Sequence, residues 1–252
     1  MRAKLSLAVL GTALLAIVIP PTMSSAASWQ PLNLQDDDSV LLNLPFTYRF
    51  CGTSYSSVYV NSNGSLTFGE GDWWFVESAD GFLQGPPRIA GFWDDLNPAA
   101  GGSIAYLITQ NAFRVRFQDV PEFFDFGAAT FEIALNRGSS QIDVAYGGSA
   151  LPKPSVGGHG PEGGKAAVRG RAPKPIAGSL TAPDGLVGVT CGRDDTTGAE
   201  QESDLTRGAT RTTLNMARRA AVYEWFDPFT TPGDVNDLGG YHLRFTNVKA
   251  PV

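Results

Sequence analysis

Apolar residues recur at every second position in several short runs between residues 100 and 146. The runs are Ile104, Tyr106 and Ile108; Phe113, Val115 and Phe117; Phe131, Ile133 and Leu135; and Ile142, Val144 and Tyr146. Polar residues such as Arg114, Arg116, Glu132 and Asp143 stand between them. Successive side chains of a strand point to opposite faces, so this pattern predicts antiparallel strands with one buried and one solvated face.

Further strand signals lie on both sides of this region. Two β-prone runs, 58–60 and 66–68, are joined through Asn63-Gly64, which predicts a hairpin with a tight turn. The run from Leu41 to Phe50 contains Pro45, which predicts an edge strand or a bulge. Residues 186–191, 221–226 and 241–245 are predicted as later strands, 193–211 as loop, and 212–219 as a turn or two of helix. The predicted fold is an all-β, antiparallel β-sandwich with long loops.

The order of several motifs resembles the nidogen-type extracellular (NIDO-like) domain, in the versions found in secreted bacterial proteins. The motifs are Ser-Asn-Gly-Ser-Leu-Thr-Phe (62–68), Pro-Arg-Ile-Ala-Gly-Phe-Trp-Asp-Asp-Leu (87–96), Gly-Gly-Ser-Ile-Ala-Tyr (101–106), Phe-Glu-Ile-Ala-Leu-Asn-Arg-Gly (131–138) and Ile-Asp-Val-Ala-Tyr-Gly (142–147). The resemblance covers residues 40–150 well, and 185–192 and 221–245 more loosely. It implies adhesion between cells and matrix in animals, and a secreted module in bacteria.

The N-terminal segment has the features of an export signal. A basic start at Arg2 and Lys4 is followed by an apolar run over residues 5–19 and by small residues at 24–27. This predicts a signal peptide over residues 1–27 and a single secreted domain over 28–252, with no membrane span after cleavage. An uncleaved N-terminal anchor is the alternative.

The charge balance excludes one class of partner. The chain has 19 basic and 25 acidic residues, a net charge of −6, and loss of two basic residues with the signal segment lowers this to −8. A nucleic-acid-binding protein normally carries the opposite sign. The expected partner is therefore an extracellular protein or a polysaccharide.

Two cysteines, Cys51 and Cys191, remain in the mature chain. In an oxidising compartment such a pair predicts a disulfide bond, with two free buried thiols as the alternative. A zinc site formed with His159 and His242 would be a third interpretation, but the four residues lack paired ligand spacing.

Residues 152–178 break the strand pattern. Prolines and glycines alternate there, and five basic residues face a single acid, Glu162. Because such a segment has few large apolar residues to bury, it is predicted to be a flexible insertion between two strands. Contact with an anionic polymer is the alternative role.

The loop over residues 70–85 carries Trp73, Trp74 and Phe75, which are candidate ligand-binding residues. Flat apolar side chains with polar edges suit sugar rings or peptides. The alternative is that these aromatic residues cover the end of the sandwich core.

Asp94, Asp95 and Asn97 are candidate ligands for a metal ion, since carboxylate and carbonyl oxygens suit a structural Ca²⁺ ion. The alternative is that they form Asx turns by accepting hydrogen bonds from backbone N–H groups. The run Asp36-Asp37-Asp38 is interpreted as a solvated turn ahead of a strand, with a cation site as the alternative. No cofactor is required by either.

The sequence shows no clear catalytic motif. A serine-histidine-acid triad would need His242, but no Gly-x-Ser-x-Gly elbow accompanies it, and the alternation places His242 and Arg244 on the face expected to be solvated. A carboxylate pair drawn from Asp94, Asp95, Glu122, Asp125 and Glu224 would suit a glycosidase instead.

The sequence therefore predicts a secreted, non-catalytic binding or adhesion module that recognises an extracellular matrix, cell-surface or polysaccharide partner. The alternative is a secreted polysaccharide hydrolase that uses a carboxylate pair. Two carboxyl groups within about 5–10 Å of each other in an aromatic cleft would favour the hydrolase.

Overall fold

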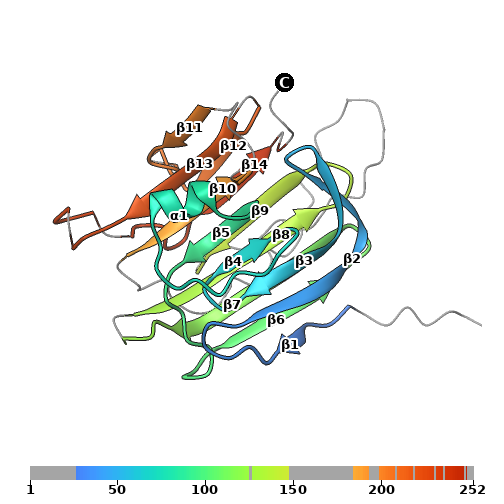
Figure 1. Ribbon diagram of the computed structural model, residues 1–252, viewed down its shortest axis with the longest axis horizontal. Helices are drawn as coiled ribbons and strands as arrows, with labels where there is room; N and C mark the ends of the chain where they lie inside the picture. The colour runs from blue at the N-terminus through green and yellow to red at the C-terminus, as the bar shows by residue number, and fades with distance from the viewer. Residues whose placement is uncertain are drawn as a thin grey trace, which may run out of the picture.

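The computed structural model describes residues 27–124, 127–147, 184–192, 199–207, 209–217, 219–229, 231–234, 236–246 and 248 (Figure 1). Residues 1–26 of the predicted signal peptide, the predicted insertion at 152–178, His159 and Asp125 lie outside the described residues.

Two seven-stranded sheets make up the described part of the chain (Figure 1). The first sheet has the order β1 (Gln30–Leu32), β6 (Ser103–Ile108), β7 (Ala112–Pro121), β8 (Ala128–Asn136), β9 (Gln141–Tyr146), β14 (His242–Thr246) and β12 (Arg211–Asn215). The second has the order β11 (Ala199–Glu202), β13 (Arg219–Phe226), β10 (Gly185–Thr190), β5 (Arg88–Trp93), β4 (Ser65–Thr67), β3 (Thr53–Asn61) and β2 (Ser39–Phe50). All neighbours are antiparallel except β12 with β14 and β11 with β13. The prediction of a largely antiparallel β-sandwich is confirmed.

The core between the sheets is built from the alternating residues of the strands. Val58 and Phe92 of the second sheet and Phe113 and Phe131 of the first belong to one buried cluster. Gly91 lets the sheets approach closely, because a Cβ there would lie 2.3 Å from the Phe131 ring. At the same point the Tyr146 hydroxyl donates a hydrogen bond of 2.8 Å to the Gly91 carbonyl, which links β9 to β5.

The predicted hairpin forms between β3 and β4, and its turn is buried. Gly64 has a φ of +80°, and a Cβ there would lie 1.7 Å from the Phe92 carbonyl oxygen, so only glycine fits. The Gly64 carbonyl accepts hydrogen bonds from the N–H groups of Gly91 and Phe92. The turn is therefore held directly against β5.

The structure confirms the prediction for residues 41–50 and shows that two predictions for the region 193–219 are wrong. β2 is an edge strand whose pairing register shifts between Asn43 and Tyr48, around Pro45, as predicted. Residues 212–219 are not helical, because Thr212 and Leu214 alternate as buried residues of β12. β11 forms within the segment predicted as loop.

One short helix, α1 (Ala79–Gln84), lies in the loop that was predicted to lack regular structure. The Ser78 hydroxyl caps its N-terminus by accepting from the Gly81 N–H. Phe82 is fully buried beside Trp93 and Tyr223 on the second sheet. A six-residue helix contains too few turns to produce a recognisable apolar period.

The outer face of the first sheet is not simply solvated, which corrects the prediction for this face. Glu132 on β8 is buried and pairs with Arg114 and Arg116 of β7 at 3.4 and 2.8 Å. His242 is also buried, and its Nε2 lies 3.1 Å from Oδ1 of Asp143. The long side chains of neighbouring strands cover these central positions, so the charges are paired as well as buried.

The disulfide bond between Cys51 and Cys191 is present, with the two Cα atoms 5.4 Å apart. It joins the residue after β2 to the residue after β10. The alternatives of free thiols and of a zinc site are thereby excluded for this pair.

Removal of the disulfide by Cys51→Ser and Cys191→Ser is expected to destabilise the protein. The bond closes a sequence separation of 140 residues, for which the loop-entropy relation gives roughly 4–5 kcal/mol. Urea unfolding under non-reducing conditions measures the difference in unfolding free energy. A double variant as stable as the parent would contradict the expectation.

Acid should weaken the fold through Asp143. Burial alone would raise the pKa of Asp143, but hydrogen bonds from His242, Arg244 and Gln141 outweigh it and lower this pKa to about 2. A pKa below the ordinary 3.8 stabilises the folded state above about pH 4, and this contribution of about 2 kcal/mol is lost as the pH falls to about 2. The amide of Asn136 also donates to Asp143, at 2.7 Å.

Urea unfolding between pH 2 and pH 6 checks this expectation. The Asp143→Asn variant should lose less stability than the parent over pH 4 to 2, because it has no carboxylate to protonate. Asp80→Asn, at an exposed position in α1, is the matched control and should follow the parent. If the unfolding free energies of the parent and of Asp143→Asn changed in parallel with pH, the expected contribution of Asp143 would be refuted.

Candidate functional site

A cavity opens at one end of the sandwich, where strands of both sheets finish. Trp93 at the end of β5 pairs with Leu186 of β10, and Gly185 pairs with Phe226 at the end of β13. β7 reaches the same place, because Leu96 and Glu122 form an isolated bridge just beyond β5 and β7. The cavity has a volume of about 230 Å³ and is lined by Phe75, Val76, Glu77, Asp94, Asp95, Glu122, Phe123, Phe124, Asp184 and Phe229.

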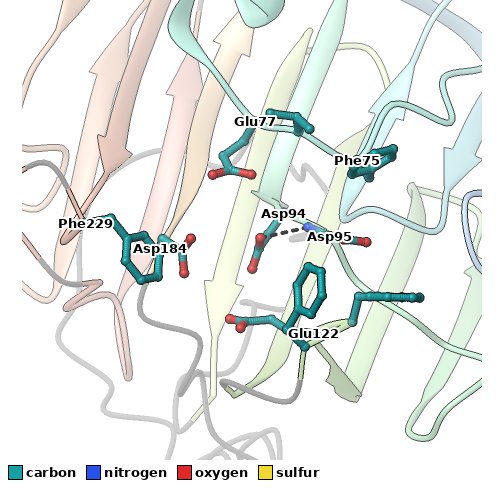
Figure 2. Close-up of a pocket in the computed structure, with 10 residues that line it drawn as sticks. Phe75, Glu77, Asp94, Asp95, Glu122, Asp184 and Phe229 are labelled. Carbon is teal, nitrogen blue, oxygen red and sulfur yellow. Dashed lines mark hydrogen bonds between the residues drawn. The ribbon is translucent and has the colours of Figure 1, made fainter.

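Carboxylates converge in this cavity (Figure 2). One carboxylate oxygen from each of Glu77, Asp94 and Asp184 lies within 4.8 Å of the other two. Figure 2 shows the carboxyl group of Glu122 directed toward the same space. The three residues other than Asp94 come from the loop before α1, the end of β7 and the residue before β10. Four segments distant in sequence therefore build one acidic group.

Asp94 and Glu122 are the two buried members of this group, each with 5% of its surface exposed. One oxygen of Asp94 has a hydrogen-bond partner. Its Oδ1 accepts a hydrogen bond of 2.8 Å from the Asp95 N–H. Oδ2 of Asp94 is buried and has no hydrogen-bond donor among the described residues. Oε1 of Glu122 is likewise buried and has no donor among them. Buried carboxylate oxygens normally have such partners, so these two atoms require an explanation.

The electrostatics of the cavity disfavour four ionised carboxylates. Burial is the main cause that raises the pKa of Asp94 well above its ordinary value, and the neighbouring charges of Glu122, Glu77 and Asp184 add to it. Burial likewise raises the pKa of Glu77 and that of Glu122 to about 7. Among the described residues that line the cavity, none is basic. The described lining side chains therefore supply no compensating positive charge.

Exposed apolar side chains surround the acidic group. We call this group the aromatic rim; it consists of four phenylalanines and one valine, namely Phe75, Val76, Phe123, Phe124 and Phe229. Phe124 and Phe229 are each 69% exposed. Phe75 and Val76 directly precede Glu77, and Phe123 directly follows Glu122. The rim and the carboxylates thus share the same loops.

Trp73 and Trp74, proposed from the sequence as ligand-binding residues, lie beside the rim and are 66% and 56% exposed. The backbone of Trp74 is nevertheless fixed. Its carbonyl accepts a hydrogen bond of 3.0 Å from the Trp93 Nε1–H, and its N–H donates a hydrogen bond of 2.9 Å to Oδ1 of Asp72. Asp72 in turn forms an ion pair with buried Arg88, whose guanidinium stacks 3.8 Å from the centre of the Trp93 ring.

The aromatic residues of this loop differ in their exposure. Phe82 packs on the second sheet, whereas Trp73, Trp74 and Phe75 face solvent. Among the described residues, these side chains form an exposed strip on a backbone that hydrogen bonds hold in place.

The residues predicted as metal ligands are distributed over different sites. Asp94 joins Glu77 and Asp184, whereas Asp95 forms a second acidic group with Asp36 and Asp37. Asn97 closes a turn through Oδ1, which accepts 3.1 Å from the Ala100 N–H, as in the Asx alternative. Figure 2 shows Asp94 and Asp95 pointing in different directions, as expected for neighbours at the end of a strand.

The carboxylates considered for hydrolysis are also separated. Asp94, Asp95 and Glu122 line the cavity, but Glu224 of β13 accepts a hydrogen bond from the Leu205 N–H instead. Sequence reasoning missed Glu77 and Asp184. Each is an isolated acid in a loop, and only the sheet pairing brings them together.

Comparisons with known proteins identify one family. The family described as NIDO related matches residues 21–183 of the chain. No curated protein and no solved structure matches the chain. In the described part of the chain, no helix is both long and apolar enough to cross a bilayer.

The exposure of the two indoles leads to a stability prediction. The double change Trp73→Ala and Trp74→Ala should lower the unfolding free energy by less than about 1 kcal/mol, because surface substitutions have small effects. Trp93→Ala, which removes a buried ring, should cost about 3–5 kcal/mol. Thermal and urea unfolding of the variants compares them. A double variant as unstable as Trp93→Ala would place the exposed indoles in the core.

Proposed function

The chain belongs to the NIDO-related family, and from that membership we propose that it is a secreted, non-catalytic adhesion module. Its partner is an extracellular matrix protein, a cell-surface protein or a polysaccharide. The observation that carries this proposal is the exposed strip of Trp73, Trp74 and Phe75 on a fixed backbone.

Such a strip suits recognition for two physical reasons. Indole and phenyl rings offer large apolar faces that gain free energy when a partner covers them. Because hydrogen bonds from Trp93 and to Asp72 already order the backbone of Trp74, less conformational entropy is lost on binding. The stacked rings of Trp74 and Phe75, with centroids 6.1 Å apart, extend this surface toward the cavity.

Two observations support secretion. The disulfide between Cys51 and Cys191 is typical of proteins that fold in an oxidising compartment. The basic start and apolar run of the first 27 residues are typical of an export signal.

The hydrolase remains the second candidate, because carboxylates do meet in a cavity with an aromatic rim. Two features argue against it. A glycosidase places one carboxyl group on each side of a sugar bond, whereas here three carboxylates share one small cavity, with one oxygen of each within 4.8 Å of the others. Asp94, the most buried of the three residues, also has only 5% of its surface exposed, which limits the access of a sugar chain.

Binding is tested on an array of immobilised matrix proteins and polysaccharides, with a panel of polysaccharide substrates assayed in parallel. We expect saturable binding without turnover. Trp73→Ala with Trp74→Ala should weaken that binding about 30-fold or more, corresponding to about 2 kcal/mol. Ile108→Ala, a half-exposed apolar residue on β6, is the matched control and should bind as the parent does.

The same experiment separates the two candidates. Turnover that disappears in Glu122→Gln while the protein stays folded would establish the hydrolase and end the adhesion proposal. Binding that is unaffected by loss of both indoles would place the contact surface elsewhere.

A further inference from the structure

We propose that Glu77, Asp94 and Asp184 bind a calcium ion, with Glu122 as a fourth ligand. This site goes beyond the adhesion function and does not depend on it. It also differs from the ligand set suggested by the sequence, since it excludes Asp95 and Asn97.

The first argument is the spacing of the oxygens. Calcium binds oxygen ligands at about 2.3–2.6 Å, so ligands on opposite sides of the ion lie up to about 4.6–5.2 Å apart. One carboxylate oxygen each from Glu77, Asp94 and Asp184 already lies within 4.8 Å of the others. An ion between them would need little movement of these side chains.

The second argument is the unpartnered oxygen of Asp94. Oδ2 is buried and accepts no hydrogen bond from any described residue, while Oδ1 is satisfied by the Asp95 N–H. An uncompensated buried carboxylate destabilises the folded protein, and a bound cation removes that cost. Oε1 of Glu122 requires a partner for the same reason.

The third argument is the chemistry of the donors. Every ionisable residue that lines the cavity in the described part of the chain is a carboxylate, with no histidine, cysteine, lysine or arginine among them. An all-oxygen set suits a hard cation and disfavours zinc or copper, which prefer nitrogen and sulfur ligands. Calcium is favoured over magnesium because it tolerates irregular, multidentate carboxylate sites and loses its waters more easily.

The proposed ion would have a defined mechanical effect. Its ligands come from the loop before α1, the end of β5, the end of β7 and the start of β10, so it would connect both sheets. Glu77 follows Phe75 and Val76, and Glu122 precedes Phe123. The ion would therefore fix both sides of the aromatic rim.

The test uses the full mature chain, first stripped with EDTA and then titrated with CaCl₂ at pH 7.5. Isothermal titration calorimetry should give one saturable site with a Kd on the order of 1 mM or tighter, as in other extracellular calcium modules. Calcium at 100 times the Kd should raise the Tm by about 5 °C or more. Magnesium at equal concentration should have a smaller effect.

Two variants assign the response to this site. Asp94→Asn should abolish both the heat of binding and the Tm rise, and in EDTA it should be at least as stable as the parent because it removes a buried charge. Asp37→Asn alters the other acidic group, and its positive φ of 49° suits asparagine, so this variant should respond as the parent does.

Three outcomes would overturn the proposal. One is the absence of any calcium-dependent heat or Tm rise, which would mean that Asp94 and Glu122 share a proton instead. Another is a calcium response that survives in both Asp94→Asn and Asp37→Asn. The third is a response lost in Asp37→Asn and kept in Asp94→Asn, which would move the ion to the second acidic group.

Discussion

The close approach of the β3–β4 turn to β5 determines how the loops at this end of the sandwich are placed. Gly64 touches the backbone of Phe92 and leaves no space for a side chain. The buried side chains next to it then hold two loops. The Asn63 amide donates to Asp37 and to the Trp74 carbonyl, and Asn61 accepts from Ser39 and Asp72. Because the turn is fixed on β5, the loop that carries Trp74 is fixed relative to Asp94 as well.

The sequence predicts the individual strands and turns better than the contacts between segments that are distant in the chain. The period of two in Phe131, Ile133 and Leu135, and the Asn63-Gly64 turn, report local backbone geometry, and both are confirmed. The acidic group depends on long-range pairing instead. Glu77 and Asp184 are more than 100 residues apart, and only the register of β5 with β10 brings them to one cavity. The burial of His242 was not predicted either, because side chains from neighbouring strands bury it and strand pairing cannot be read from its own strand.

The boundary of the family match has a structural meaning. The match ends at residue 183, just before β10, yet β10 lies between β5 and β13 in the second sheet. β14, still later in the chain, pairs with β9 in the first sheet. The later strands therefore complete both sheets, and Asp184 completes the acidic group. Chains that share only the matched part would need another way to cover the edges of β5 and β9.

The disulfide has a consequence for the way in which proteases break the protein down. It links residues on either side of 139 intervening positions, so all of the chain from β3 to β10 lies inside one covalent ring. A protease that cuts a single bond in this ring opens it without releasing a fragment. The two pieces stay attached through sulfur, and the inter-strand hydrogen bonds of both sheets still hold them in register. A protein nicked once in this region would remain a single molecule, and it would come apart only after a second cut or on reduction.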